Sequence, residues 1–449
     1  MRLSAFPSGP GAAALWPRGR LRAVFERSKA LPSSPVFFGV PTRRVQADAS
    51  SRAFAHVPVS HARLEQLLEA EITTLSLRVP KPLTVKCLLE VTEGSSVEEL
   101  AQLLHEELPV RFAQRIKMLE DLPDWKSKVS IASVRQMYVT SFKELRLADP
   151  HQPQQFQKQL RAIKERHAQT NLLVGSFNQY AEACEIQTTQ INEWLDKFFA
   201  LRLYTNMLMS HYLQISRSSL STLDSLRGTM FKFEPQDDPY RSSIDPNCQV
   251  HAIAQHAADV VTQMSRLRYG LAPDIEVVDR GSQPLPFVPR YLLYIISELL
   301  KNAVRSTVEL HAGKDFMPPI RITVSGDENV CCCRISDEGG GIPRDKLSQV
   351  WSYLYSTAPA IKEPSSRKAV DAPADLKRVF GSPQFKEAGA EPEAISVSPL
   401  AGLGCGLPLS RLYARHLGGS VELQTMPRCG TDVYVYINRL GTGDSLPYL

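Results

Sequence analysis

The chain has 449 residues, 43% of them hydrophobic, so it is long enough to form two or three domains with substantial cores. It contains no run of about 18 uninterrupted apolar residues, so no membrane span is predicted. The net charge of +5 comes from residues 1–50, which hold eight Lys and Arg residues against two acidic ones. Because the remainder is nearly neutral, the composition argues against a nucleic-acid-binding protein.

Residues 1–50 are rich in Arg, Ser, Ala and Pro and lack a long apolar stretch. This profile is typical of an organelle transit peptide, and we expect mitochondrial targeting, with a disordered basic arm as the alternative. The eight cysteines show no paired metal-ligand spacing, and the consecutive Cys331, Cys332 and Cys333 would alternate between the two faces of a strand. We therefore expect neither a disulfide framework nor a zinc site.

Residues 60–225 have apolar spacings of three and four, which predict a helical bundle with helices near 61–77, 96–119, 127–147, 154–183 and 188–216. A Pro- and Asp-rich loop is expected over 225–245. From 246 to 440 helices alternate with strands, which predicts an α/β sandwich and, for the whole chain, the α+β class. Residues 359–398, rich in Pro, Ala, Ser and charges, interrupt this second domain and form a candidate lid.

The most informative helix spans Tyr294–Leu310, where apolar residues at helical spacing leave Glu298, Asn302 and Arg305 on one polar face. A glutamate in this position can accept a hydroxyl proton, and an asparagine oxygen one turn later can bind Mg²⁺. Alone, the pattern is more typical of an ordinary amphipathic helix with a solvated polar face. Two glycine-rich loops that follow it, Ser336–Pro343 and Ala401–Pro408, make the combination more specific.

In the first loop, Asp337 ends a predicted strand and precedes Gly339, Gly340 and Gly341. A carboxylate there can accept a hydrogen bond from an exocyclic amine, which suits adenine, while the glycines let a flat ligand or the chain itself approach closely. In the second loop, glycines precede a helix beginning near Leu407, so backbone amides and the helix N-terminus can bind a phosphate. Taken singly, the first loop is equally typical of a simple tight turn, and a pattern like the second is often only the turn that enters a helix.

Five segments together resemble the family of mitochondrial pyruvate dehydrogenase kinases and branched-chain 2-oxoacid dehydrogenase kinases: Ser297–Glu309, Ser336–Pro343, Tyr353–Pro359, Leu400–Ala414 and Cys429–Tyr436. The resemblance covers about residues 60–440. It implies a four-helix bundle followed by the Bergerat nucleotide-binding fold that is shared with histidine kinases.

The resemblance implies a role for each matching position. Glu298 would be the general base, Asn302 the Mg²⁺ ligand and Asp337 the adenine-binding carboxylate. The remaining ATP-binding positions would be Lys301, Arg305, Gly339, Gly341, Ser356, Thr357, Gly402, Leu403, Gly404, Cys405, Gly406, Leu407 and Thr431. The backbone carbonyls of Val350, Ser352 and Tyr355 match positions that hold K⁺.

In the helical half, Glu107–Lys117 and Arg166–Tyr180 also resemble the family. Tyr138, His167 and Arg202 would line an inhibitory site for small 2-oxo or halo acids, whereas His167 taken alone reads as a buried structural histidine. The chain departs from the family at Asn206, where an arginine is usual, so carboxylate binding would lose a charge-assisted partner. Tyr294 matches the branched-chain enzyme, whereas Tyr355–Pro359 resembles the pyruvate enzymes, so the residues do not select a substrate.

We therefore expect a protein serine kinase of the mitochondrial matrix that uses Mg²⁺-ATP to phosphorylate and inactivate the α subunit of a 2-oxoacid dehydrogenase. The family resemblance also implies a homodimer and binding of the bundle to a lipoyl domain. Two alternatives are a histidine kinase, for which no fitting histidine motif stands out, and a catalytically silent nucleotide-binding scaffold on the dehydrogenase core.

Overall fold

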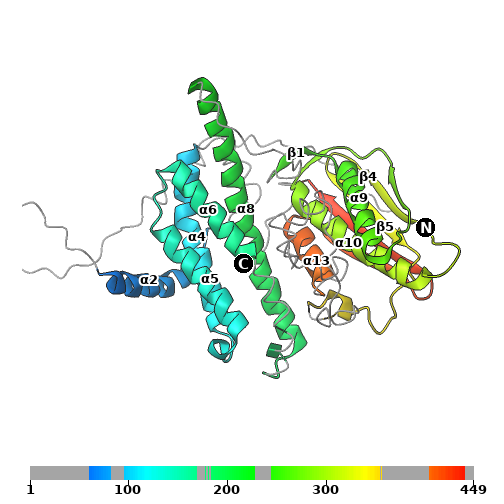
Figure 1. Ribbon diagram of the computed structural model, residues 1–449, viewed down its shortest axis with the longest axis horizontal. Coiled ribbons are helices and arrows are strands. Elements are labelled where there is room, and N and C mark those ends of the chain that lie inside the picture. Colours follow the sequence, from blue (N-terminus) through cyan, green and yellow to red (C-terminus); the bar gives the residue numbers. More distant parts are fainter. Residues whose placement is uncertain are drawn as a thin grey trace, which may run out of the picture. The chain divides into compact units, whose positions relative to one another are not determined.

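The computed structural model describes residues 60–81, 96–168, 184–227, 244–353 and 404–439, together with Phe177, Tyr180, Ala181 and Tyr355. The predicted leader (1–50), the predicted lid (359–398) and four predicted ATP-binding residues (Ser356, Thr357, Gly402 and Leu403) lie outside these ranges. Helices alone make up the first part, and helices with strands make up the second (Figure 1). The predicted α+β class is confirmed.

The helical part contains α2 (His61–Ser76), α4 (Val97–Glu120), the short η1 (Trp125–Ser127), α5 (Val129–Arg146), α6 (Pro153–Ala168) and α8 (Thr188–Arg227). Helix α4 is central, since it packs against α2, α5 and α8. It begins with a capping box, in which Ser96 accepts a hydrogen bond from the Glu99 amide and the Glu99 carboxylate accepts one from the Ser96 amide. Its buried face carries Leu104, Leu108 and Phe112, none of which is exposed.

The second part contains β1 (Asp245–Cys248), α9 (Val250–Tyr269), β2 (Ile275–Asp279), β3 (Leu285–Phe287), α10 (Pro289–His311), β4 (Ile320–Gly326) and β5 (Val330–Asp337). These are followed by η3 (Gln349–Trp351), α13 (Gly406–His416), β6 (Ser420–Met426) and β7 (Gly430–Asn438). The main sheet has the order β2-β4-β5-β7-β6; β2 and β4 are parallel and the other pairs antiparallel. Strands β1 and β3 form a separate antiparallel ribbon.

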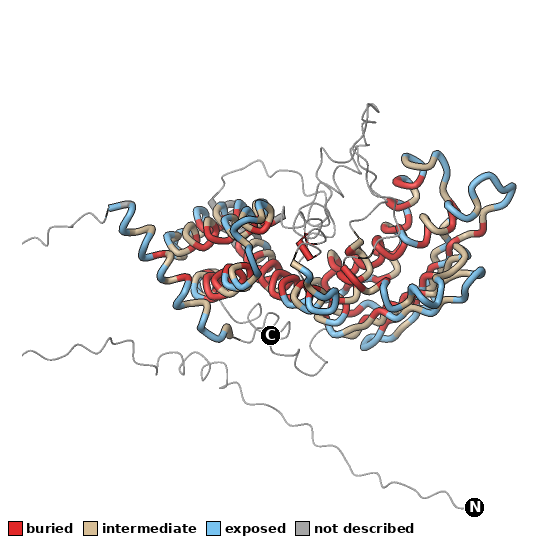
Figure 2. Tube along the Cα trace, turned by 90° about the horizontal axis from the view of Figure 1, so that it is seen from below, coloured by how far each residue is buried: buried red, intermediate tan, exposed pale blue. Residues whose placement is uncertain are grey.

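Helices α9, α10 and α13 all contact the main sheet. Strand β5 shows the resulting alternation: Cys331 and Cys333 are buried, whereas Cys332 is partly exposed, as predicted. Figure 2 shows buried positions concentrated along the helices. On the strands burial alternates from residue to residue, as in β4 and β7. The three cysteines therefore contribute to the core as small apolar side chains.

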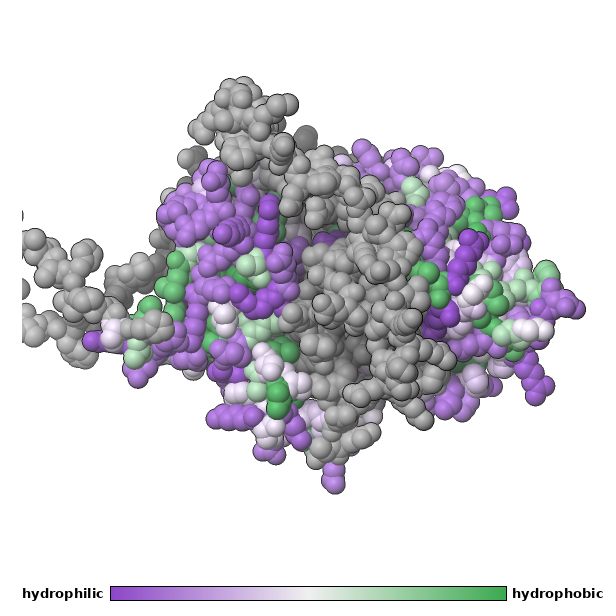
Figure 3. Space-filling view, in the orientation of Figure 1, coloured by the Kyte–Doolittle hydropathy of each residue, from purple (hydrophilic) through white to green (hydrophobic). Residues whose placement is uncertain are grey.

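The face drawn in Figure 3 is mainly hydrophilic where it is coloured, with apolar residues in small groups. Across the described ranges, no helix has both the length and the apolar character that crossing a membrane requires.

Candidate active site

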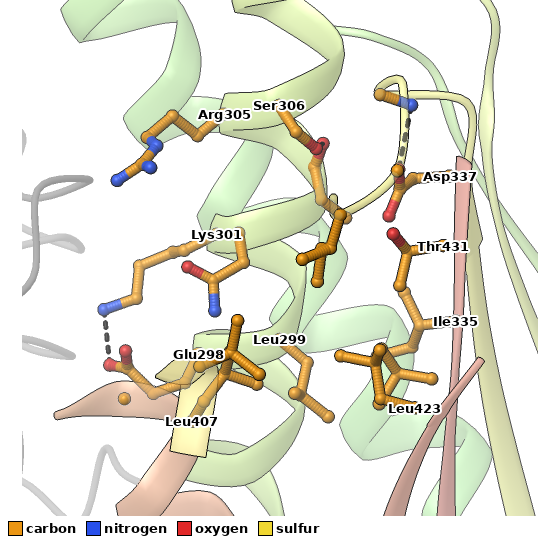
Figure 4. A pocket seen from close by; sticks show the side chains of 18 of the residues that line it. Glu298, Leu299, Lys301, Arg305, Ser306, Ile335, Asp337, Leu407, Leu423 and Thr431 are labelled. Atoms are coloured by element: carbon orange, nitrogen blue, oxygen red, sulfur yellow. Dashed lines mark hydrogen bonds and ion pairs between the residues drawn. The ribbon is translucent and has the colours of Figure 1, made fainter. Parts of the chain in front are cut away.

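A cavity of about 630 Å³ lies between helix α10, the β5, β6 and β7 strands, the loop after β5 and the start of α13. Residues from segments far apart in the sequence line it (Figure 4). Of the predicted site residues, the lining includes Glu298, Lys301, Asn302, Arg305, Asp337, Gly339, Gly341, Val350, Tyr355, Gly404, Gly406, Leu407 and Thr431. The polar face of α10 and both glycine loops thus border one space.

Helix α10 positions Glu298 because the apolar stripe of the helix is buried around it. Pro289 occupies the first turn, where its missing N–H is not needed, and Ile296 and Leu300 are completely buried. Glu298 is only 6% exposed and forms an ion pair with Lys301, which is 8% exposed. This carboxylate is therefore largely shielded from water, with its charge balanced inside the cavity.

Asn302 lies one turn after Glu298, is exposed and lines the cavity. Arg305 lines it a further turn along and forms an ion pair with Glu309 (3.5 Å). The amide oxygen of Asn302 is a hard ligand of the kind Mg²⁺ accepts, and Mg²⁺ in phosphate sites commonly uses one or two protein ligands. These residues therefore fit Mg²⁺ bound together with a phosphate.

Asp337 is the last residue of β5, and its Oδ1 accepts a hydrogen bond from the Gly339 amide (2.8 Å). Burial raises the pKa of the Asp337 carboxyl to about 6, although backbone hydrogen bonds from Gly339 and Thr431 oppose the rise. Thr431 is its register partner on β7. Figure 4 shows Asp337 and Thr431 at one end of the cavity and Glu298 and Lys301 at the other. An elongated ligand with an amine at one end and an anion at the other matches this arrangement.

The glycines of the first loop are needed mainly for the packing of the chain on itself. Gly341 has a φ of +67°, and a Cβ there would meet the Met426 carbonyl oxygen at 2.2 Å. The loop after β5 is thereby pressed against the β6–β7 turn, which fixes the end of the cavity beside Asp337.

The second glycine loop enters α13, which begins at Gly406, one residue before the predicted start. Gly404 has a φ of +77°, a conformation that favours glycine. Leu407 lines the cavity, as does Gly406 in the first turn of α13, where amides without intrahelical partners suit an anion. The Cys405 side chain is instead buried and absent from the lining, and burial raises the pKa of its thiol to about 12.

Gly406 also limits the space beside Glu298, since a Cβ at position 406 would lie 2.5 Å from Glu298 Oε2. The backbone at Gly406 is helical and accepts alanine, so Gly406→Ala should act mainly by displacing the carboxylate. We predict a turnover number roughly ten- to hundredfold lower, since small misplacements of reacting groups have such effects. Steady-state kinetics and the thermal unfolding midpoint check this; a turnover number within twofold of wild type would contradict it.

The predicted residues of the helical part also lie together. The rings of Tyr138 and His167 are 4.6 Å apart, and Arg202 Nη2 donates a hydrogen bond to the His167 carbonyl oxygen (2.7 Å). Arg115, which sequence reasoning missed, is fully buried beside them and hydrogen-bonds to Tyr138, Thr205 and the Leu201 carbonyl oxygen. Its signal in the sequence is an arginine one helical turn after Arg111, on the helix face that also carries Leu108 and Phe112.

Positive charge gathers in this cluster. The pKa of His167 is held well below its ordinary value, mainly because the ring is buried and to a smaller extent because the positive charges of Arg115 and Arg202 are close. Burial also lowers the pKa of Arg115, with smaller contributions from Arg202 and Arg111. An anion among these groups would relieve their mutual repulsion. Asn206 points elsewhere, since its Nδ2 donates to the Tyr291 hydroxyl of α10 (3.4 Å).

Val350 and Tyr355 line the cavity, but Ser352 does not. Ser352 is buried, and its Oγ donates to Asn192 on α8 (3.1 Å). The three residues predicted to hold K⁺ thus lie in one short segment between the cavity and α8.

Two family descriptions match the chain. Residues 82–244 match the description "Mitochondrial branched-chain alpha-ketoacid dehydrogenase kinase", and residues 288–440 match "Histidine kinase-, DNA gyrase B-, and HSP90-like ATPase". The second match contains α10, the main sheet except β2, and α13. Fold, site and matches together define a protein kinase whose ATP-binding domain is of the Bergerat type.

Curated relatives extend the similarity along the chain. A mitochondrial pyruvate dehydrogenase (acetyl-transferring) kinase of Arabidopsis thaliana is 30% identical over 351 residues, 76% of this chain and 85% of the relative. The mitochondrial pyruvate dehydrogenase (acetyl-transferring) kinase isozyme 1 of Homo sapiens is 28% identical over 427 residues, 91% of this chain and 88% of the relative. The chain belongs to the family of mitochondrial pyruvate dehydrogenase and branched-chain α-ketoacid dehydrogenase kinases. The relatives do not favour a histidine kinase or a silent scaffold.

Proposed function

We propose that this chain is a mitochondrial protein serine kinase that transfers the γ-phosphoryl group of ATP to the α subunit of a 2-oxoacid dehydrogenase and thereby inactivates it. The observation that supports this most strongly is the convergence of Glu298, Asn302, Asp337 and the start of α13 on one cavity. Phosphoryl transfer depends mainly on positioning and electrostatic stabilisation, so this small set of groups is sufficient.

Each group has a proposed task. Asp337 accepts a hydrogen bond from the adenine amine, and Thr431 lies beside it. Lys301, Arg305 and the amides of the second glycine loop bind the phosphates, while Glu298 orients the acceptor serine and removes its proton. Mg²⁺, held by Asn302, would neutralise charge on the triphosphate.

We also propose that the carbonyl oxygens of Val350, Ser352 and Tyr355 hold K⁺. The Ser352 carbonyl accepts a hydrogen bond from the Tyr355 amide (3.3 Å), which leaves it a second lone pair for a cation. The segment Gln349–Tyr355 borders the cavity, so a cation there would support the nucleotide site from its side.

For the helical part, we propose that Tyr138, His167 and Arg202, joined by Arg115, bind small 2-oxo or halo acids that inhibit the kinase. Buried positive charge supports a carboxylate ligand. With Asn206 in place of an arginine, the ligand meets one guanidinium fewer, and Arg115 provides the second one besides Arg202. We propose further that the same helical part binds the lipoyl domain of the acyltransferase core. We also propose that the kinase is a homodimer and that it acts in the mitochondrial matrix.

The deciding experiment is phosphorylation of two purified complexes side by side. The full chain is incubated with radiolabelled ATP and either the pyruvate or the branched-chain dehydrogenase complex, and phosphate on the α subunit is followed together with residual dehydrogenase activity. We expect acid-stable phosphoserine and matching loss of activity in one complex. Acid-labile phosphate on the kinase itself would indicate a histidine kinase, and ATP binding without transfer to either complex would indicate a scaffold.

A further inference from the structure

The segment Gln349–Tyr355 has two sides. Val350 and Tyr355 line the cavity, whereas Ser352 and Tyr353 are buried away from it. The backbone hydrogen bonds of this segment are local. The amides of Val350, Ser352 and Tyr355 donate to the carbonyl oxygens of Lys346, Gln349 and Ser352, respectively. Among the described residues this short turn forms no backbone hydrogen bond to a strand, so its position depends on side-chain contacts.

Helix α8 provides such contacts from two residues one helical turn apart. The Oδ1 atom of Asn192 accepts hydrogen bonds from the Ser352 hydroxyl (3.1 Å) and the Tyr353 amide (3.2 Å). The Tyr353 hydroxyl donates to Asp196 Oδ1 at 2.6 Å, the short distance typical of a charge-assisted bond. We call these three bonds, made by Asn192, Asp196, Ser352 and Tyr353, the α8 clamp.

Ring contacts with α8 and α13 reinforce the clamp. Tyr353 is 1% exposed, and its ring stacks on Phe199 of α8 with centroids 5.6 Å apart. A further contact comes from α13, where the Arg411 guanidinium lies over the Trp351 ring, 4.7 Å from its centroid. Burial and the Asp196 carboxylate hold the pKa of Tyr353 well above its ordinary value, so its hydroxyl remains a donor. The segment is therefore held by contacts with α8 and with α13, the helix that follows the second glycine loop.

We propose that Asn192 and Asp196 are positioning residues of the nucleotide site, which act through Ser352 and Tyr353 to fix the cavity wall formed by Val350 and Tyr355. A helix of the bundle thereby sets the affinity of a cavity that belongs to the other part of the chain. The inference rests on the proposed function, in which this cavity binds ATP.

The test is titration of the full chain with a fluorescent ADP analogue, with Tyr353→Phe and Asn192→Ala as independent variants. Tyr353→Phe keeps the ring that stacks on Phe199 and removes only the donor. We expect each variant to raise the nucleotide Kd roughly three- to tenfold, as the loss of a hydrogen bond would, and to leave kcat at saturating ATP within twofold. Tyr436→Phe, on β7 and outside the cavity lining, is the matched control and should bind as wild type does.

Asp196→Ala combined with Tyr353→Phe should weaken binding no more than the stronger single variant, because both remove the same bond. Unchanged Kd values in folded single variants, or additive effects in the double variant, would overturn the clamp. A merely structural role would instead lower the active fraction and the thermal midpoint at constant Kd. If the wild-type chain binds no nucleotide at millimolar concentration, the proposed function fails as well; normal wild-type binding with unaffected variants refutes this inference alone.

Discussion

Replacing Glu298 by glutamine is expected to lower kcat about 10²- to 10⁴-fold while ATP still binds, the range typical of losing a general acid or base. Glutamine has the shape of glutamate and can still accept a hydrogen bond from Lys301, but it cannot take the serine proton at neutral pH. The ion pair with Lys301 is nearly buried, so the variant leaves an ammonium group without its counter-charge. The free protein should therefore unfold at a lower temperature, and Mg²⁺-ATP should restore much of the difference because phosphate can pair with Lys301.

A matched control lies on the same helix. Glu309 also lines the cavity but is exposed and forms its ion pair with Arg305. Glu309→Gln should keep kcat within about twofold of wild type, since exposed ion pairs contribute little. The measurement is single-turnover phosphorylation of the dehydrogenase with ATP binding recorded in parallel. If Glu298→Gln transfers phosphate at a rate within tenfold of wild type, Glu298 is not the general base.

Replacing Asp337 by asparagine should weaken ATP binding about 10- to 100-fold. An asparagine oxygen can still accept the hydrogen bond from the Gly339 amide, but the remaining NH₂ group would face the adenine amine, so two donors would meet. Charge-assisted hydrogen bonds are worth about 1.5–3 kcal/mol, which corresponds to the expected range. Calorimetric titration with ADP checks it, with Asp279→Asn as the control because Asp279 also ends a strand but lies on the surface.

The pKa of about 6 at Asp337 adds a pH dependence to the same prediction. Since the ionised carboxylate accepts the adenine hydrogen bond, wild-type affinity should fall as pH drops through about 6, whereas the Asp337→Asn variant should lack this decline. The folded protein holds this proton more tightly than the unfolded chain, in which the pKa of an aspartate is near 3.8. The free energy of unfolding should therefore fall as the pH rises from about 3.8 to about 6. Above pH 6 the ligand-free Asp337→Asn variant should thus be the more stable protein. Equal affinity of both proteins at pH 7.5 would exclude Asp337 from adenine binding.

Helix α10 and the alternating strand β5 could be predicted because period 3.6 and period 2 are local properties of the sequence. Strands β1 and β3 were not predicted. They have four and three residues, begin with Asp-Pro and Leu-Pro, and exist because Asp245 pairs with Phe287 and Cys248 with Leu285 across 37 or more residues. Helix α8 continues to Arg227, beyond the predicted 216, through a serine-rich stretch whose helix propensity is weak.

The candidate site shows the same division between local and long-range information. Glu298 and Asn302 are one turn apart, so their shared face follows from the sequence alone. Arg115 and the α8 clamp could not be predicted in this way, since an arginine on the apolar face of an amphipathic helix and an Asn–Asp pair on a long helix acquire partners only through tertiary packing. The Cys405 side chain is buried in the protein and does not face the cavity, although the glycines on both sides of it line the cavity. This orientation likewise depends on how α13 packs against α10.

The most direct test of the central claim is a crystal structure of the full chain with Mg²⁺ and a non-hydrolysable ATP analogue. We expect the adenine amine at Asp337, the metal at the Asn302 oxygen and the γ-phosphate between the start of α13 and Glu298. A nucleotide bound outside this cavity, or a cavity left empty at millimolar analogue, would contradict the account.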